Sequence, residues 1–206
     1  MRKTKKDTEI SKLRILMAAE EEFCQRGFVA ANMENIAKAA GMTKGAIFWH
    51  YQSKVGLFRA IIKRATERTK TIFRETLSAP EPTLFLEKCK KVLLKIKKDN
   101  AFKVLLVLSD IDKTRDIPKE VLLECKKTIS EIMAEAAGVL VAAKKNGELR
   151  PETDVQTILM TLVLIMSGFA KTEEFKSLIE PIGNRIDDES IINAIFNGLL
   201  SFQTPK

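Results

Sequence analysis

Residues 41–54 read GMTKGAIFWHYQSK, and the only tryptophan, histidine and tyrosine of the chain stand together at positions 49–51. Thr43 and Lys44 precede these rings, and Gly45 follows the lysine. A hydroxyl group, an ammonium group, a residue without a side chain and several rings make a surface that suits a phosphate backbone and base edges. The types and order of these residues therefore favour noncovalent recognition of a polyanion.

Two short helices joined by a tight turn are expected to present these residues. The first follows Asn32, a favourable N-cap, and ends at Gly41, while Thr43 caps the second. Small or aliphatic side chains on the inner faces let two such helices cross closely, and here they are Ile36, Ala37, Ala40 and Ile47. The pattern over about residues 32–51 predicts a helix-turn-helix, whose second helix lies in the major groove of DNA.

The remainder of the chain is predicted to be helical, because apolar residues recur every three or four positions and no alternating run indicates a strand. The first helix is expected from about Ile10 to Arg26, before Gly27, and a long fourth helix follows Ser53. Further helices are expected at about 83–98, 101–110, 118–145, 153–171 and 187–202, with another turn or two at 172–178. The predicted fold class is all-α.

The positive charge of the chain lies in its first third. Residues 1–76 hold 16 Lys and Arg against 8 Asp and Glu, whereas residues 77–206 are neutral. Such segregation indicates that a polyanion, either nucleic acid or an anionic membrane surface, binds the basic part. With the prolines of SAPEPT at 78–83 as a boundary, we expect a DNA-binding domain at 1–53, a connecting helix at 54–76 and a second domain beyond it.

The composition argues against several kinds of site. One histidine, three scattered cysteines, no glycine-rich phosphate loop and no GxSxG motif give an enzyme no recognisable catalytic centre, and neither metal nor cofactor is expected. The odd number of cysteines fits a reducing compartment. The basic N-terminus is not followed by an apolar stretch of the kind found in signal peptides. The most apolar run, residues 155–170, is shorter than a membrane span. We therefore expect a cytoplasmic protein without a membrane partner.

Three segments with their mutual spacing, AAEEEFCQRGF, NMENIAKAAG and GMTKGAIFWHYQSK, resemble the TetR family of bacterial transcriptional regulators. The resemblance covers about residues 10–60. It implies contact with phosphates or base edges at the start of a recognition helix, close approach at its glycine, rings along the groove and a lysine on a phosphate after it. The DNA-binding residues implied in this way are Thr43, Lys44, Gly45, Phe48, Trp49, His50 and Lys54.

The ring residues differ in the role that is expected of them. Tyr51 stands where the family usually has an inward phenylalanine, so we expect it to pack inside. Phe48 stands where the family often has a tyrosine, and without a hydroxyl an apolar contact such as one with a thymine methyl group is expected. His50 is expected to donate to a phosphate oxygen. For Trp49, contact with DNA and packing against the domain remain equally open.

The resemblance also implies that residues 77–206 bind a small, largely apolar ligand and form a symmetric dimer. The dimer is expected through the apolar helices at about 155–170 and 188–202. The stretch GAIFWHY is similar to some repressors of multidrug efflux pumps within the family. Candidate ligand-binding residues between the helices of this domain are Phe85, Phe102, Leu106, Asp110, Glu124, Cys125, Ile129, Met133, Gln156, Met160 and Leu164.

These observations predict a homodimeric bacterial repressor that a small-molecule ligand releases from a double-stranded DNA operator. Two alternatives stay open: a basic helical protein that docks on an anionic membrane or a protein partner, and a small helical enzyme. The sequence leaves the ligand, the operator and the choice between repression and activation undetermined.

Overall fold

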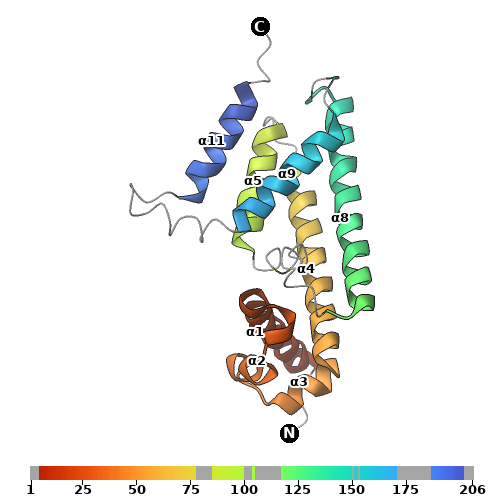
Figure 1. The fold of residues 1–206 in the computed structure, drawn as a ribbon, viewed down its shortest axis with the longest axis vertical. Helices are drawn as coiled ribbons and strands as arrows, with labels where there is room; N and C mark the ends of the chain where they lie inside the picture. The colour runs from red at the N-terminus through yellow and green to blue at the C-terminus, as the bar shows by residue number, and fades with distance from the viewer. Residues whose placement is uncertain are drawn as a thin grey trace. The chain divides into compact units, whose positions relative to one another are not determined.

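The computed structural model describes residues 5–77, 85–99, 104, 117–149, 151–152, 154–170 and 187–201. In these residues the regular structure is helical throughout and no strand occurs, which confirms the all-α fold class (Figure 1). The expected boundary at 78–83, the helix expected at 101–110 apart from Val104, and the turns expected at 172–178 lie outside the described residues. The helices are α1 (Lys5–Ala30), α2 (Met33–Ala40), α3 (Lys44–Tyr51), α4 (Lys54–Leu77), α5 (Phe85–Lys98), α8 (Lys119–Lys145), α9 (Val155–Ala170) and α11 (Asp188–Ser201).

The first helix starts earlier than its apolar pattern suggested. The expected start at Ile10 is wrong, because α1 already includes Lys5. Asp7 in the first turn suits the positive end of the helix dipole, and Lys12 donates to Glu9 at 2.9 Å one turn earlier. At the other end the prediction is confirmed, since the helical backbone breaks at Gly27, with φ 72° and ψ 179°.

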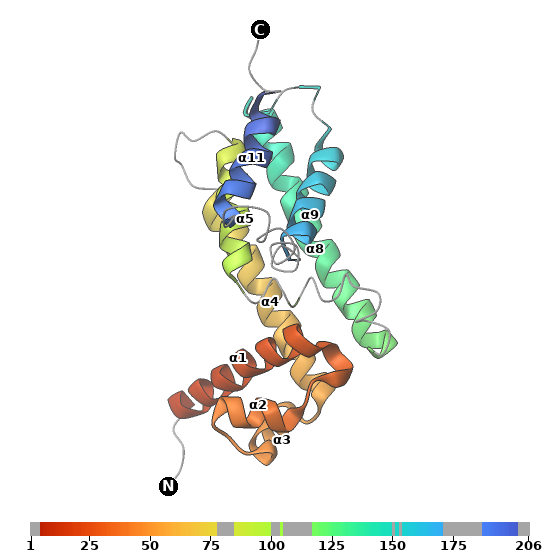
Figure 2. The same cartoon turned by 60° about the vertical axis from the view of Figure 1, so that its left-hand side comes forward.

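The described residues form two compact units. The first takes residues within 1–68 and 100–130, and the second takes those within 69–99 and 131–206. Helices α1, α2 and α3 belong wholly to the first unit, where they lie together in both views (Figures 1 and 2). The long helices α4 and α8 each contribute residues to both units. The domain boundaries expected from the sequence concern functional roles and remain predictions.

The core of the first unit is built around three phenylalanine rings. Phe23 and Phe28 from α1 and Phe58 from α4 lie with centroids 5.1 to 6.0 Å apart, in one stacked, one tilted and one edge-on pair. Ile36 of α2 and Ile47 of α3 are fully buried as well, as the inward pattern predicted. These rings therefore pack α1 against α4, the helices that precede and follow the helix-turn-helix.

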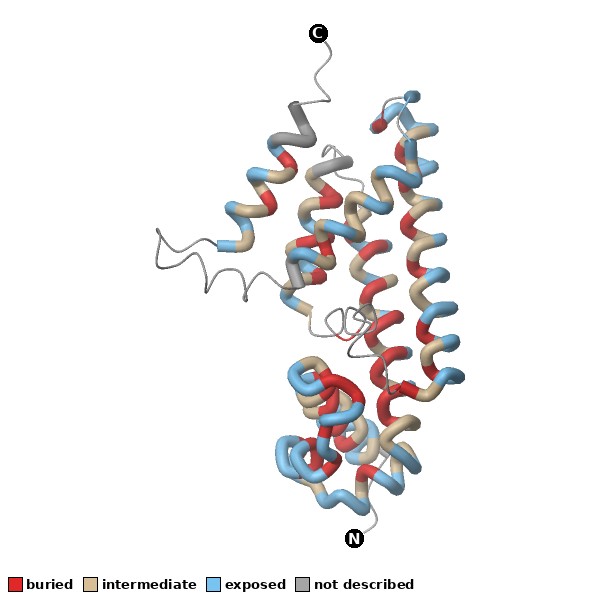
Figure 3. Tube along the Cα trace, in the orientation of Figure 1, coloured by how far each residue is buried: buried red, intermediate tan, exposed pale blue. Residues whose placement is uncertain are grey.

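The core of the second unit is mainly aliphatic, with the buried rings of Phe73 from α4 and Phe196 from α11 among the described residues. Helix α5 contacts both α9 and α11. Ile96 of α5 and Ile192 and Phe196 of α11 are buried, and Lys97 forms an ion pair with Asp188 at the start of α11. In α4, α5 and α8 the buried positions recur along one side of the helix (Figure 3), which is the amphipathic pattern of helices that share a core.

Candidate nucleic-acid interface and apolar pocket

The start of α2 is fixed by side chains that occupy its free backbone groups. The Asn32 side chain accepts from the Glu34 N–H at 2.8 Å, which confirms the expected N-cap. Glu22 of α1 accepts from the Asn32 N–H at 2.9 Å and from the Asn35 amide at 3.2 Å. One carboxylate therefore ties the beginning of α2 to α1.

The turn between α2 and α3 requires a glycine because of its backbone conformation. Gly41 has φ 64° and ψ 40°, in the left-handed region that residues with a Cβ rarely adopt. A Cβ there would also lie 2.6 Å from a guanidinium nitrogen of Arg14, a contact that this flexible side chain can relieve by moving. The Met42 N–H donates to the Ala37 carbonyl at 2.9 Å and closes the end of α2. The sequence prediction of a sharp turn at Gly41 is confirmed.

Helix α3 is anchored at its first turn and along its inner face. The Thr43 hydroxyl accepts from the Ala46 N–H at 3.1 Å, so Thr43 is the N-cap that the sequence predicted. Ile47 is fully buried. Tyr51 is half-buried, as expected of an inward ring, and its hydroxyl donates to the Lys12 carbonyl at 3.3 Å. Burial raises the pKa of Tyr51 to about 12, so it remains a protonated donor at neutral pH.

The outer face of the same helix presents the residues that the sequence singled out. Phe48 is 39% exposed and Trp49 is 74% exposed, so the tryptophan does not pack into the domain. His50 is half-buried, and its ring meets Trp49 edge-on at 4.6 Å between centroids. The other expected contacts on this face, Thr43, Lys44 and Gly45, are also exposed. Their contact with DNA remains a prediction.

The two lysines of the expected interface are placed differently. Lys44 lies on the surface and donates to the Glu34 carboxylate at 2.8 Å, which holds the pKa of Glu34 below its usual range. Lys54 donates to the Val29 carbonyl at 2.8 Å and lies 5.2 Å from the centroid of the Phe28 ring. Partial burial lowers the pKa of Lys54. Lys54 thus ties the start of α4 to the end of α1, in addition to any phosphate it meets.

Two residues that hold this unit together were missed from the sequence. Glu20 is buried and accepts from Arg64 of α4 at 2.5 Å. A Cβ at Gly56 would lie 2.1 Å from the Tyr51 carbonyl oxygen, so only glycine lets α4 approach the end of α3. The sequence did hold one signal for Glu20, which stands on the apolar stripe of α1, three residues before Phe23.

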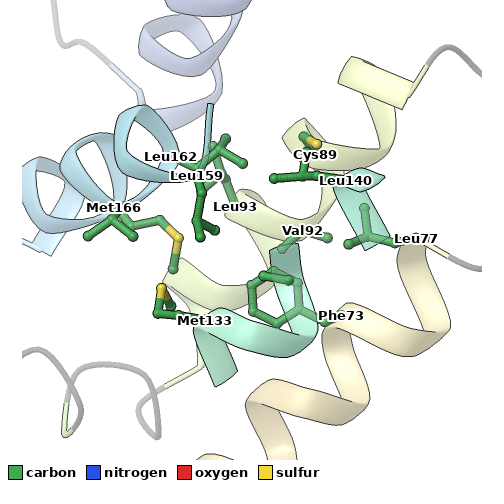
Figure 4. Close-up of a pocket in the computed structure, with 12 residues that line it drawn as sticks. Phe73, Leu77, Cys89, Val92, Leu93, Met133, Leu140, Leu159, Leu162 and Met166 are labelled. Atoms are coloured by element: carbon green, nitrogen blue, oxygen red, sulfur yellow. The ribbon is translucent and has the colours of Figure 1, made fainter. Parts of the chain in front are cut away.

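A pocket in the second unit is lined by apolar side chains from four helices (Figure 4). Its free space of about 30 Å³ is that of a nearly filled core. Burial raises the pKa of the Cys89 thiol to about 12, so this lining residue stays neutral. The lining residues are Phe73 and Leu77 of α4, Cys89, Val92 and Leu93 of α5, Met133, Ala136 and Leu140 of α8, and Leu159, Leu162, Val163 and Met166 of α9.

The candidate ligand-binding residues that the sequence suggested do not gather around this pocket. Met133 lines the pocket, whereas Met160 and Leu164, on the same helix as four lining residues, are exposed. Gln156 is exposed, Cys125 is buried, Ile129 is half-buried, and Glu124 accepts from Arg59 at 2.7 Å in the first unit. Phe102, Leu106, Asp110 and the side chain of Phe85 lie outside what the structure describes.

Comparison with known proteins identifies the family. The model of a family described as bacterial regulatory proteins, tetR family, matches residues 15–61, from the inner face of α1 into α4. The HTH-type transcriptional repressor BepR of Brucella suis is 29% identical over 174 residues, which is 82% of this chain and 83% of BepR. The chain is a transcriptional regulator of the TetR family. The resemblance that its helix-turn-helix segments suggested is thereby confirmed.

Further relatives of this TetR-family regulator match nearly the whole chain. UidR of Escherichia coli is 28% identical over 198 residues, 95% of each chain. The solved structures of FadR from Bacillus subtilis, in complex with stearoyl-CoA, and of NalD, the secondary repressor of the MexAB-OprM multidrug efflux pump in Pseudomonas aeruginosa, share its fold. FadR gives a TM-score of 0.66 at 17% identity, covering 90% of this chain and 95% of FadR. NalD gives 0.62 at 21% identity, covering 96% and 97%.

The relatives are regulators of transcription rather than enzymes. Within the described part of the chain, no three His, Cys, Asp or Glu side chains gather where they could hold a metal ion. No helix among the described residues of this TetR-family regulator is both long and apolar enough to cross a membrane.

Proposed function

We propose that this TetR-family regulator is a homodimeric repressor that binds a double-stranded operator through α3 and is released by a small apolar ligand. The observation that carries the DNA-binding part is the division of α3 into two faces. Its inner face is anchored by Ile47 and Tyr51, while its outer face carries the exposed rings of Phe48 and Trp49, with Lys44 on the surface in an ion pair with Glu34. Such a helix suits the major groove of DNA.

The operator is tested in a mobility-shift assay on the DNA upstream of the chain's own coding sequence. We expect a preferred site, and we expect Lys44→Ala to weaken binding and to reduce the slope of log K against log salt by about 0.9, the value for one phosphate. Lys63→Ala, which removes an exposed lysine from α4, serves as the charge-matched control. Binding without any preferred site at moderate salt would refute the operator, and an unchanged slope would remove Lys44 from the interface.

The apolar pocket supports release by an uncharged, apolar ligand. Its lining offers no charged side chain, and two flexible methionines, Met133 and Met166, point into it (Figure 4). Because the pocket is nearly filled, a ligand has to displace side chains to enter. Helix α4 supplies Phe73 and Leu77 to the lining and begins directly after α3, so a shift of α4 is the proposed route of release. A ligand acts only if it binds the DNA-incompetent state more tightly.

The neutral apolar fluorophore N-phenylnaphthylamine tests this pocket. We expect its emission to rise with the wild-type protein and with Val141→Leu, a control at an exposed position of α8. Ala136→Leu fills the pocket from the same helix and should abolish the signal while operator binding is retained. Equal fluorophore binding by both variants would place the apolar site elsewhere.

The proposed dimer uses the helices expected from the sequence, α9 and α11. It is supported by two large apolar side chains on α9, Met160 and Leu164, which are 59% and 65% exposed in the single chain. They lie one turn apart and form a stripe that a second copy would cover. Leu164→Asp should shift the sedimentation coefficient to that of a monomer. Leu123→Asp changes an equally exposed leucine on α8 and should leave the dimer intact; a dimer that survives Leu164→Asp argues against α9.

A further inference from the structure

The recognition helix carries few groups that read bases by hydrogen bonds. Lys44–Tyr51 contains no Arg, Asn, Gln, Asp or Glu, the residues that most often pair with guanine, adenine or cytosine edges. Lys44 is already held by Glu34 at 2.8 Å, and His50 is half-buried against the Trp49 ring. Sequence-specific reading by this helix therefore has to rely largely on something other than hydrogen bonds from side chains.

The centre of the outer face is apolar and has open space beside it. Successive residues of an α-helix are rotated by about 100°, so positions 45 and 49 lie opposite the buried Ile47. Trp49 is the most exposed large side chain of this helix, and Gly45 stands one turn before it. A Cβ built on Gly45 would meet no atom nearer than the Thr43 hydroxyl at 3.9 Å. Phe48 flanks Trp49 and is 39% exposed.

Thymine is the base that shows an apolar group, its methyl, to the major groove. We propose that α3 reads thymine methyl groups, with Trp49 and Phe48 as the specificity-determining side chains and Gly45 as the gap that admits the base edge. This inference rests on the operator binding proposed above. Methylated cytosine carries the same group at the same position of the groove, so it should substitute for thymine at the contacted pair.

The test replaces single thymines of the footprinted operator by uracil, which removes the methyl group and keeps base pairing. At one or two positions in each half-site, wild-type affinity should fall about fourfold, the factor that corresponds to ~0.8 kcal/mol for one buried methylene group. At the operator position that the replaced side chain contacts in the wild type, Trp49→Ala and Phe48→Ala should each bind the thymine and the uracil duplex with equal affinity. Restoring the methyl with methylated cytosine opposite guanine should recover part of the lost affinity.

Met17→Ala is the matched control, because it removes an exposed apolar side chain from α1 of the same unit and should keep the discrimination. Circular dichroism verifies that each variant is folded, and Phe48→Leu replaces Phe48→Ala if that variant unfolds. Uracil duplexes that bind the wild type as tightly as thymine at every position would overturn the inference and leave operator binding intact. Discrimination that persists in both aromatic variants would assign it to other residues, whereas the absence of any preferred site would overturn the proposed function as well.

Discussion

The helix-turn-helix and the apolar pocket are stabilised by opposite kinds of contact. Around α2 and α3, named polar groups fix the helix starts, at Asn32 and Thr43, and glycines permit the turn at Gly41 and the close approach of α4 at Gly56. The pocket in the second unit is bounded by aliphatic, aromatic and thioether side chains. Directional polar contacts specify one geometry, whereas apolar packing tolerates rearrangement. The geometry of the helix-turn-helix is therefore closely specified, whereas the side chains around the apolar pocket can rearrange.

The largest expected effect tests how far the stability of the second unit depends on its apolar core. Phe196 of α11 is 1% exposed, so Phe196→Ala should lower the free energy of unfolding by about 3 to 5 kcal/mol. Urea denaturation followed by circular dichroism measures this value. Val141→Ala truncates an exposed residue of α8 and should change it by less than ~1 kcal/mol. Equal small losses would mean that the second unit does not depend on its apolar core.

A buried carboxylate should matter nearly as much in the first unit. Glu20→Ala leaves the Arg64 guanidinium without the acceptor that it now contacts, and we expect a loss of roughly 3 kcal/mol. Glu20→Gln keeps an acceptor oxygen and should lose less. Glu21→Ala, at the exposed neighbouring position, should stay within about 0.5 kcal/mol in the same denaturation experiment. A neutral Glu20→Ala would show that polar contacts do not determine this unit's stability.

Replacement of Gly45 and of Gly56 by alanine should change the stability of the protein in opposite directions. Gly56→Ala places a methyl group 2.1 Å from the Tyr51 carbonyl oxygen, so we expect a loss of about 2 kcal/mol. Gly45→Ala adds its methyl to open space, and the better helix propensity of alanine should raise stability by up to ~1 kcal/mol. Thermal denaturation separates the two. If Gly56→Ala melts like the wild type, α4 does not need its close approach to α3.

The smallest effect concerns the ion pair between Lys44 and Glu34. Glu34→Gln frees Lys44 and removes a negative charge beside the proposed interface, so operator affinity should rise roughly twofold to fivefold at low salt. Because Lys44 lowers the pKa of Glu34, this carboxylate stays charged at neutral pH and in mild acid. The gain should therefore vanish only in stronger acid, where Glu34 is protonated. Glu21→Gln is the control; an equal gain there would indicate a general charge effect.

Local patterns were sufficient to predict the helix-turn-helix, because its caps and turn act within a few residues. Asn32, Gly41 and Thr43 could each be recognised from their neighbours alone. Contacts between distant residues gave no such signal. Glu20 and Arg64 are 44 positions apart, and Lys54 meets a carbonyl 25 positions away.

The pocket could not be predicted for a different reason. Helix α9 carries large apolar side chains on its exposed face as well, Met160 and Leu164 beside the polar Gln156, so apolar character alone does not mark the residues that line the pocket. Met160 and Leu164 were predicted to contact ligand, yet Leu159, Leu162, Val163 and Met166 are the lining residues of this helix. Which apolar side chains leave a gap between them depends on how four helices pack, and no local window contains that information.

The position of Trp49 has a practical consequence. It is the only tryptophan of the chain, and it is 74% exposed at the centre of the outer face of α3. Its indole emission therefore reports on a single point of the molecule, without any attached label. Quenching or a spectral shift on adding duplex DNA would come from that point alone, so titrations, stopped-flow association rates and ligand-induced dissociation can all be followed with the unmodified protein.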